Sequence, residues 1–252
     1  MAEESPFTKA NRDNWDATSK AYQASHHADL AGDVLWGPSM PPERELKVLG
    51  ESVAGKDIVE IACGGGQSAV YLAKMGARVT AIDFSAAQLE HARAFARSQK
   101  ADIRFLEANV EDLSRLEDAT FDIGFSAYAF GFVEDIRGAF SEIERILRPG
   151  GLFAFSWMSP LYAITEERGL LVSRSYFDRS PIVFKDADGT EVDFHRTYGD
   201  WHRALTDAGF VVTDIVVPEP LAQESTYAEV FPLSKIRMIP GTTIWRARKP
   251  AA

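Results

Sequence analysis

The sequence contains one cysteine among its 252 residues. A single thiol cannot form a disulfide within the chain, and it cannot build a zinc site that depends on several cysteines. We therefore expect no metal ion in the protein. Cys63 stands within a glycine-rich stretch, where a small buried residue beside a ligand is more common than a reactive thiol.

Long apolar runs are also missing. The sequence has no apolar stretch of about 18 residues, and it opens with the polar, acidic segment Met1-Ala2-Glu3-Glu4. A membrane-spanning helix needs about 20 mostly apolar residues, and a secretion signal needs a basic start followed by an apolar segment. These absences predict that no membrane is involved and that the protein is cytoplasmic.

Basic residues are fewer than acidic ones. The chain has 27 Lys and Arg against 37 Asp and Glu, a formal net charge of −10 and a pI near 5.0. Recognition of a nucleic-acid backbone requires clustered Lys and Arg, and no such cluster occurs. We expect no nucleic-acid partner and favour a small-molecule substrate.

The overall composition is typical of a globular enzyme. Hydrophobic residues make up 46% and charged residues 25% of the chain, which are ordinary values for a folded domain. A chain of this length can fold as a single α/β domain with a full core. Both a monomer and a homodimer remain open.

The most informative stretch runs from Asp57 to Asp83. An apolar strand leads into the consecutive glycines 64–66, a short helical segment follows, and a second strand ends on Asp83. Glycines let the backbone approach a ligand with no Cβ in the way. An acid at the end of the second strand offers two acceptor oxygens where a ribose diol would lie. This β-loop-α-β unit predicts a nucleoside-cofactor site.

The spacing of the glycines discriminates between cofactors. A dinucleotide fingerprint has the pattern G-x-G-x-x-G, and its third glycine would fall on Gln67. The acid Glu60 instead precedes the loop, as in the first motif of class I S-adenosylmethionine-dependent methyltransferases, (D/E)-x-G-x-G-x-G. Ala62 replaces the first glycine of that pattern. The loop therefore resembles that family more closely.

The resemblance extends over about residues 56–157. Phe84 and a capping-box pattern, Ser85 to Gln88, follow the second strand. Strands are expected at residues 103–106 and 121–126, with Asn109-Val110-Glu111 between them. Arg148-Pro149-Gly150-Gly151 matches the family's (K/R)PGG segment, and its Pro and Gly end the preceding helix.

The resemblance implies a Rossmann-like α/β fold. We expect a seven-stranded, mostly parallel sheet with helices on both faces, an antiparallel last strand, an N-terminal helical lid and an insertion after the fifth strand. The expected divisions are a lid at 1–42, a cofactor-binding core at 43–157, a substrate-side insertion at 158–200, and a C-terminal helix and strands at 201–252. Deleting residues 1–35 is expected to leave the sheet folded.

The resemblance also implies S-adenosyl-L-methionine as cofactor and S-adenosyl-L-homocysteine as product. Asp83 would accept hydrogen bonds from the ribose hydroxyls, and Asn109 and Val110 would lie at the adenine edge. The residues expected to contact the cofactor are Tyr22, Trp36, Glu60, Ala62, Cys63, Gly64, Gly66, Gln67, Asp83, Phe84, Gln88, Asn109, Val110, Glu111 and Ser126.

The substrate side is predicted from aromatic residues. Tyr128 follows the fourth strand, where open α/β sheets bind ligands, and Tyr162 lies in the insertion. Asp186-Ala187-Asp188-Gly189 predicts a hairpin turn within the insertion. As general bases we consider His26, expected on the lid, and His195, expected after the hairpin, because a histidine titrates near neutral pH.

The expected activity is methyl transfer to a small molecule, with an O or N nucleophile favoured over C or S. An amine acceptor needs orientation more than a base. Two other functions stay open: a non-catalytic protein that binds S-adenosylmethionine or S-adenosylhomocysteine, and a nicotinamide-dependent oxidoreductase. The missing third glycine disfavours the oxidoreductase, and aromatic residues on the lid and insertion disfavour the non-catalytic protein.

Overall fold

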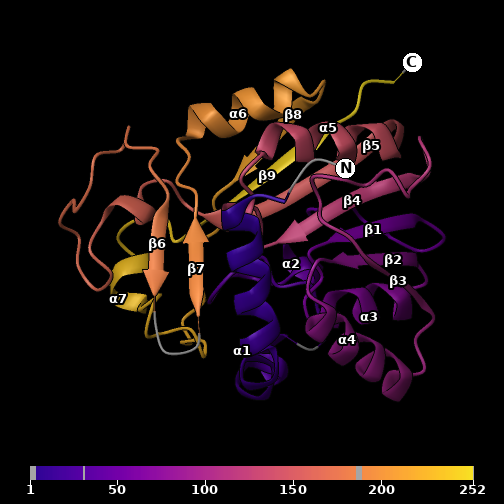
Figure 1. Cartoon of the computed structure of the whole chain (residues 1–252), viewed down its shortest axis with the longest axis horizontal. Coiled ribbons are helices and arrows are strands. Elements are labelled where there is room, and N and C mark those ends of the chain that lie inside the picture. The colour runs from indigo at the N-terminus through magenta and orange to yellow at the C-terminus, as the bar shows by residue number, and fades with distance from the viewer. Residues whose placement is uncertain (1–3, 31, 186–188, 252) are drawn as a thin grey trace.

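A computed structural model describes residues 4–30, 32–185 and 189–251. Its centre is a seven-stranded sheet with strand order β3-β2-β1-β4-β5-β9-β8 (Figure 1). The strands are β1 (Asp57–Ile61), β2 (Arg78–Asp83), β3 (Ile103–Glu107), β4 (Phe121–Ala127), β5 (Leu147–Met158), β8 (Val211–Val216) and β9 (Thr242–Arg248).

Strands β1 to β5 pair in parallel, and β9 lies antiparallel between β5 and β8. The predicted seven-stranded sheet with an antiparallel last strand is therefore confirmed. The order of strands reverses beside β1, which has β2 on one side and β4 on the other. Ligands of open α/β sheets bind at such a switch point, beyond the carboxyl ends of the strands.

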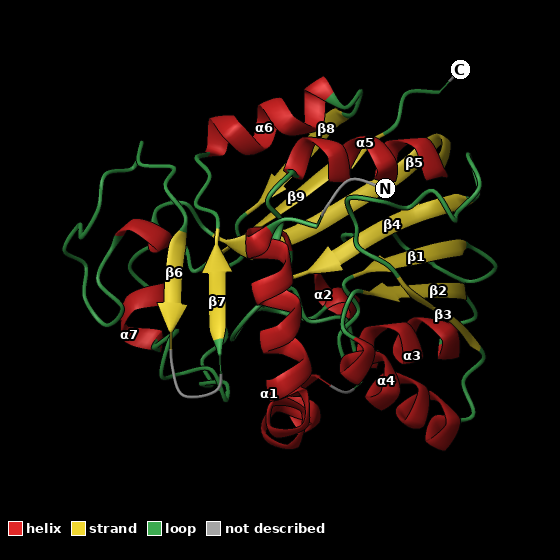
Figure 2. Cartoon of the chain, in the orientation of Figure 1, coloured by secondary structure: helices red, strands yellow, loops and turns green. Residues whose placement is uncertain are grey.

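Helices cover both faces of this sheet (Figure 2). They are α1 (Pro6–Leu30), α2 (Glu43–Leu46), α3 (Gln67–Lys74), α4 (Ala86–Gln99), α5 (Ile136–Ile146), α6 (Tyr198–Asp207) and α7 (Leu233–Ile236), with short 3-10 turns η1 (Phe130–Phe132) and η2 (Tyr162–Ile164). None of the described helices is long and apolar enough to cross a membrane.

Alternation along the strands produces two cores. Val59 and Ile61 face the core that contains the apolar sides of α5 and α6, whereas Ile58 faces the core of α3 and α4. Successive side chains of a strand point to opposite faces, so a parallel strand covered on both sides is apolar throughout. This burial fixes the register that brings the loops after β1, β2, β3 and β4 to one edge.

The second core also includes part of the segment expected to be a lid. Val34 and Trp36 are fully buried in it, and the Trp36 indole donates a 2.9 Å hydrogen bond to the buried Glu43 carboxylate. The reason for expecting that deletion of residues 1–35 spares the sheet is contradicted, because Val34 belongs to the core; the effect of the deletion itself stays a prediction.

A separate two-stranded sheet, β6 (Ile182–Lys185) and β7 (Thr190–Asp193), forms the predicted hairpin of the insertion. Residues 186–188 of the predicted turn lie outside the described residues. Helix α1 lies between this hairpin and the α3–α4 side of the sheet (Figure 1). The helix and the hairpin therefore stand beside the edge where the loops of β1–β4 meet.

Helix α6 begins earlier than the sequence indicated. We expected a helix over 201–208, and the structure has Tyr198–Asp207. Thr197 and Asp200 form a reciprocal capping box at its start, and this satisfies two N–H groups that a helix leaves without partners. The first turn of α6 is fixed by this polar cap, and the spacing of apolar residues in the sequence gives no sign of it.

Candidate active site

The glycine turn after β1 alternates left-handed and right-handed residues. Ala62, Gly64 and Gly66 have φ angles of +55°, +51° and +73°. Glycine adopts such angles without steric cost, whereas in alanine the Cβ comes too close to the following carbonyl oxygen. The family's preference for glycine at the first of these positions thus has a direct backbone cause, and Ala62 keeps the conformation at a cost in stability.

Asp83 ties this turn to the end of β2. Its Oδ2 accepts a 2.8 Å hydrogen bond from the Gly64 N–H, and its Oδ1 accepts one of 2.9 Å from the Ser85 N–H. Burial raises the pKa of this carboxyl to about 6, although these two N–H groups act in the opposite direction. Each oxygen has a second lone pair, so the carboxylate can still accept hydrogen bonds from a ribose diol.

Glu60, at the end of β1, is a buried acid that is only partly satisfied. Within the part of the chain that the structure describes, its Oε2 has no hydrogen-bond partner. Burial raises the pKa of the carboxyl to about 8; the Ala69 N–H lowers it and the charge of Asp83 raises it further. A buried acceptor without a partner is costly. An ammonium group in the cavity would supply the missing donor.

The loop after β3 holds Asn109 and Glu111 in a tight turn. Asn109 Oδ1 accepts from the Glu111 N–H, and Asn109 Nδ2 donates to Glu111 Oε2, both at 3.1 Å. Glu111 Oε1 also accepts from the Asp135 N–H at 2.8 Å. The Asn109 amide therefore already forms one donor and one acceptor hydrogen bond with Glu111. Its carbonyl oxygen keeps a second lone pair.

Helix α1 closes one side of the site through amide side chains. Gln67 donates to Gln23 at 2.6 Å, and Gln23 donates to Gln88 at 2.9 Å. Gln23 also packs so closely on the glycine turn that a Cβ built on Gly65 would lie 2.5 Å from its Oε1. A side chain at position 65 would therefore displace the Gln23 amide.

A second attachment joins α1 to the start of α4. Asp16 Oδ1 accepts hydrogen bonds from the Ser85 hydroxyl at 2.6 Å and from the Ala87 N–H at 3.2 Å. An acid at a helix N-terminus interacts favourably with the helix dipole. The helix is thereby fixed over the loops that carry Glu60, Gly64 and Asp83.

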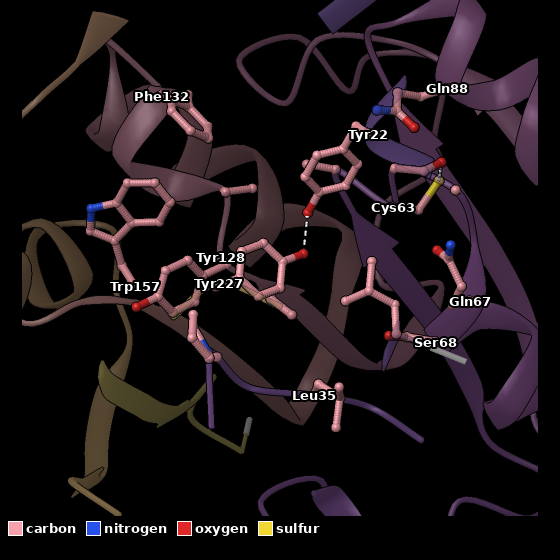
Figure 3. Close-up of a pocket in the computed structure, with 18 of the residues that line it drawn as sticks. Tyr22, Leu35, Cys63, Gln67, Ser68, Gln88, Tyr128, Phe132, Trp157 and Tyr227 are labelled. Atoms are coloured by element: carbon pink, nitrogen blue, oxygen red, sulfur yellow. Dashed lines mark hydrogen bonds between the residues drawn. The ribbon is translucent and has the colours of Figure 1, made fainter. Parts of the chain in front are cut away.

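These elements enclose a cavity of about 970 Å³, near the upper end of the range of roughly 300–1,000 Å³ for small-molecule sites. Figure 3 shows Cys63, Gln67 and Gln88 on one side of it. Phe132, Trp157 and Tyr128 lie on the other side. Between them, the hydroxyls of Tyr22 and Tyr227 are hydrogen-bonded at 2.6 Å.

Most of the residues predicted from sequence line this one cavity. They are Tyr22, Glu60, Ala62, Cys63, Gly64, Gln67, Asp83, Phe84, Gln88, Asn109, Val110, Glu111 and Tyr128. The fold therefore brings the ends of β1 to β4 together with α1, as the strand order requires. Whether each residue contacts the cofactor stays a prediction.

Four other predicted positions lie away from the cavity. Trp36 belongs to the core beneath the sheet, held there by Glu43. Tyr162 is buried against Phe231 and donates to the Val230 carbonyl at 2.5 Å. Gly66 and Ser126 are not among the residues that line the cavity. The Gly66 N–H donates to the Cys63 carbonyl, and a Cβ at Gly66 would lie 2.9 Å from the Ala92 Cβ.

Neither histidine proposed as a base lines the cavity. The His26 ring stacks between Tyr22 and Tyr227, with centroids 4.5 and 4.4 Å away. Its Nδ1 lies 3.0 Å from the Tyr22 carbonyl oxygen. His195 is buried, and its Nε2 lies 3.0 Å from the Tyr176 carbonyl oxygen. His26 is therefore one layer behind the tyrosines that line the cavity, and a role as base for either histidine stays a prediction.

Sequence reasoning missed several lining residues. Glu191 and Asp193 lie on β7, Trp157 lies on β5, and Tyr227 precedes α7. For Glu191 and Asp193, the alternation of the predicted hairpin was an available signal. Tyr227 has no local motif that marks it, because the contact with Tyr22 spans 205 positions of sequence.

The described residues include no group of three or more His, Cys, Asp and Glu side chains that could hold a metal ion. Burial raises the pKa of the Cys63 thiol well above its usual range, which keeps it protonated and a poor nucleophile. The chemistry of the cavity is therefore that of carboxylates, amides and aromatic rings.

Comparison with known proteins shows which family the chain resembles. Residues 59–155 match a family described as "Methyltransferase domain". A solved S-adenosylmethionine-dependent methyltransferase from Mesorhizobium loti superimposes with a TM-score of 0.66 at 26% identity, covering 81% of this chain and 95% of that one. The chain therefore contains a methyltransferase domain, and over most of its length it is similar to S-adenosylmethionine-dependent methyltransferases.

Curated relatives agree on the family. An uncharacterized methyltransferase, YbaJ of Bacillus subtilis, is 29% identical over 84% of this chain and 80% of its own length. The malonyl-[acyl-carrier protein] O-methyltransferase of Pectobacterium atrosepticum is 37% identical, over 45% of this chain and 43% of its own length. The match with the relative of named acceptor thus spans less than half of that enzyme.

The residues of this methyltransferase fit S-adenosylmethionine. The unpaired Glu60 Oε2 suits the ammonium of the methionine portion, and Asp83 has lone pairs free for the ribose. Gly64 leaves the turn open, since a Cβ there would meet only Gln88 Oε1, at 3.9 Å. The nicotinamide alternative loses its support, because the family and the unpaired acid both favour the sulfonium cofactor.

Proposed function

We propose that this enzyme transfers the methyl group to an oxygen or nitrogen of a small acceptor that is neutral or positively charged. The observation that carries this proposal is the excess of acidic over basic side chains in the cavity wall. Among the described lining residues, Arg44 alone is basic, and it pairs with Asp33 at 2.8 Å. Eight are acidic: Asp33, Glu60, Asp83, Glu111, Glu167, Glu191, Asp193 and Glu224.

This distribution disfavours an anionic acceptor. A carboxylate or phosphate would enter a cavity of like charge with no free guanidinium to bind it, and recognition of such groups usually uses Arg. Like charges brought together in a desolvated site reject the wrong ligand. The malonyl group in the name of one relative is acidic, so we do not transfer that acceptor to this chain.

Aromatic rings supply most of the remaining wall. Trp15, Tyr22, Phe132 and Trp157 line the cavity, and their contacts hold them edge to face, Trp15 against Tyr22 and Phe132, and Phe132 against Trp157. Such faces bind flat apolar groups, and they attract cations through the ring quadrupole. The wall therefore fits an aromatic acceptor or one bearing an amine.

The residues of the chain have limited chemical work to do. When bound, S-adenosylmethionine supplies a methyl group that is already activated. Glu60 and Asp83 fix the methionine and ribose portions, Gln23 and Tyr22 exclude water, and the aromatic wall orients the acceptor. Alignment of this kind provides a large part of the rate enhancement.

Three probes of equal ring size test the proposal. Tyramine is a cation at neutral pH, 4-ethylphenol is neutral, and 4-hydroxyphenylpropionate is an anion. Incubated with methyl-labelled S-adenosylmethionine, the enzyme should methylate the first two at least about tenfold faster than the third, a difference of about 1.4 kcal/mol. Preferred methylation of the anion would refute the proposed specificity. Binding of S-adenosylhomocysteine without transfer to any acceptor would support the non-catalytic alternative.

A further inference from the structure

Strand β7 presents two acids to the cavity. Residues two apart on a strand point to the same side, and both Glu191 and Asp193 line the cavity whereas Val192, between them, does not. Asp193 is the more buried of the two, at 6% exposure. The hairpin therefore contributes two carboxyl groups to the cavity wall.

Hydrogen bonds on both sides of Asp193 hold it in place. The buried Asn11 of α1 donates to the Val192 carbonyl at 2.9 Å and accepts from the Val192 N–H at 2.7 Å. The Phe194 N–H donates to the Gly131 carbonyl at 2.8 Å. Gly131 is in turn fixed beneath Trp157, since a Cβ there would lie 1.9 Å from the indole. The backbone on both sides of Asp193 is thus held by hydrogen bonds.

One oxygen of this carboxylate has no partner. In the described chain, Asp193 Oδ1 is buried and receives no hydrogen bond. Arg196, the nearest candidate cation along the chain, gives its hydrogen bonds to the carbonyls of Phe130, Val133, Glu134 and Phe194. Burial raises the pKa of Asp193 to about 7, and the charge of Arg196 only partly opposes this.

A buried polar group without a partner requires an explanation. A structural acid would be expected to form an ion pair, because an unpaired buried charge is strongly destabilising. Asp193 has none among the described residues, although Arg174 and Arg196 act on it electrostatically. Because Asp193 lines the cavity, a donor group on a bound molecule would satisfy this oxygen.

The position of Asp193 favours the acceptor as that molecule. The cofactor residues follow β1, β2 and β3, whereas the charge of Asp193 acts on Tyr128, which follows β4. Tyr128 has a left-handed φ of +60°, and strain of this kind concentrates at functional sites. Strand β4 is the neighbour of β1 on the side away from β2, so the residue on which Asp193 acts belongs to the β4 side of the cavity and not to the side of Asp83.

We propose that Asp193 binds the acceptor and takes its proton. This inference rests on the proposed methyl transfer to O or N. The Asp193 carboxylate accepts a hydrogen bond from the O–H or N–H of the attacking atom. As that atom bonds to the methyl carbon, the carbon–sulfur bond breaks with its electron pair going to sulfur. The acceptor's proton passes to Asp193 and then to water once the product leaves.

The test compares Asp193→Asn with Asp214→Asn, the same charge change on an exposed position of β8. Binding of tyramine is measured by calorimetry on enzyme saturated with S-adenosylhomocysteine. We expect Asp193→Asn to weaken tyramine binding about tenfold or more, the loss associated with a hydrogen bond to a charged group. Affinity for S-adenosylhomocysteine should stay unchanged, and Asp214→Asn should behave as the wild type.

Turnover and stability give independent readouts. Loss of a proton acceptor should lower tyramine methylation about 10²-fold or more. At pH 8 the free Asp193→Asn protein should melt about 2–4 °C higher, because a buried charge is removed. Wild-type tyramine affinity in Asp193→Asn, a lower melting temperature, or absence of tyramine binding to the wild type would each overturn the assignment. Failure of methyl transfer with intact tyramine binding would instead refute the proposed function.

Discussion

At the scale of single residues, the backbone of the glycine turn explains one departure from the family pattern. Ala62 has a φ of +55°, where an L-residue with a Cβ is less stable than glycine by about 1–2 kcal/mol. A glycine at this position would also increase the conformational entropy of the unfolded chain, and this offsets about 0.4–1 kcal/mol of that difference. Ala62 is therefore a position where the enzyme is less stable than it could be.

We accordingly expect Ala62→Gly to raise the free energy of unfolding by about 0.5–1 kcal/mol, measured by urea denaturation. Ala73→Gly, within helix α3, is the matched control, and it should lose about 1 kcal/mol. A loss at position 62 similar to that at position 73 would show that the left-handed angle imposes no cost on the alanine.

At the scale of elements, α1 is attached to the cofactor loops by two sets of hydrogen bonds, one at Asp16 and one at Gln23. Hydrogen-bonded groups of this kind contribute about 0.5–1.5 kcal/mol each, so α1 can be loosened without unfolding the sheet. The enzyme would then bind its cofactor in a site open to water.

We expect Gln23→Ala to increase amide hydrogen exchange in α1 while exchange in β1, β4 and β5 stays unchanged. Affinity for S-adenosylhomocysteine should fall about threefold to thirtyfold, because two hydrogen bonds that fix the wall are lost. Lys9→Ala, which removes an exposed ion pair with Asp13 on the same helix, is the control. Equal exchange in wild type and Gln23→Ala would mean that packing alone holds α1.

The elements of the sheet were predictable because their signals are local. Apolar strands, the Pro-Gly segment after α5 and the Ser85 cap of α4 each act within a few residues, and the structure has them where expected. The cofactor loops could be predicted for the same reason, since strand order brings their ends together. The antiparallel last strand expected within 201–252 is present as β9.

The wall opposite these loops could not be predicted in the same way. Trp36 and Tyr162 had the aromatic character of pocket residues, yet both are buried in cores. Asp193, Trp157 and Tyr227 reach the cavity through contacts between segments far apart in sequence. Side-chain type alone does not distinguish a ring that packs in a core from one that packs against a ligand.

At the scale of the whole molecule, three buried acids lower stability as pH rises, against the smaller opposite effect of buried His195, whose pKa burial lowers. Burial raises the pKa of Glu60 to about 8, of Asp193 to about 7 and of Asp83 to about 6, above the usual values of about 4 in an unfolded chain. The folded protein then binds more protons than the unfolded chain, so stability is fully present below about pH 4 for these groups and falls as pH rises through the folded values.

We therefore expect the free energy of unfolding of the free enzyme to fall between about pH 5 and pH 8, by up to about 1.4 kcal/mol per pH unit for each acid still protonated. Denaturant titrations at several pH values measure this slope. Glu60→Gln should flatten the upper part of the curve and stabilise the protein at pH 8, while weakening S-adenosylhomocysteine binding. A stability that rises over this interval would contradict the proposed protonation of the acids.

We predict that Asp83 and Glu60, at the carboxyl ends of β2 and β1, bind the ribose and methionine portions of the cofactor. Calorimetric titration with S-adenosylhomocysteine of wild type, Asp83→Asn and the surface control Asp214→Asn tests it most directly. We predict micromolar binding by wild type and control, about −8 kcal/mol. Asp83→Asn should bind about tenfold or more weakly. Equal affinity in all three proteins, or no binding by the wild type, would contradict the account.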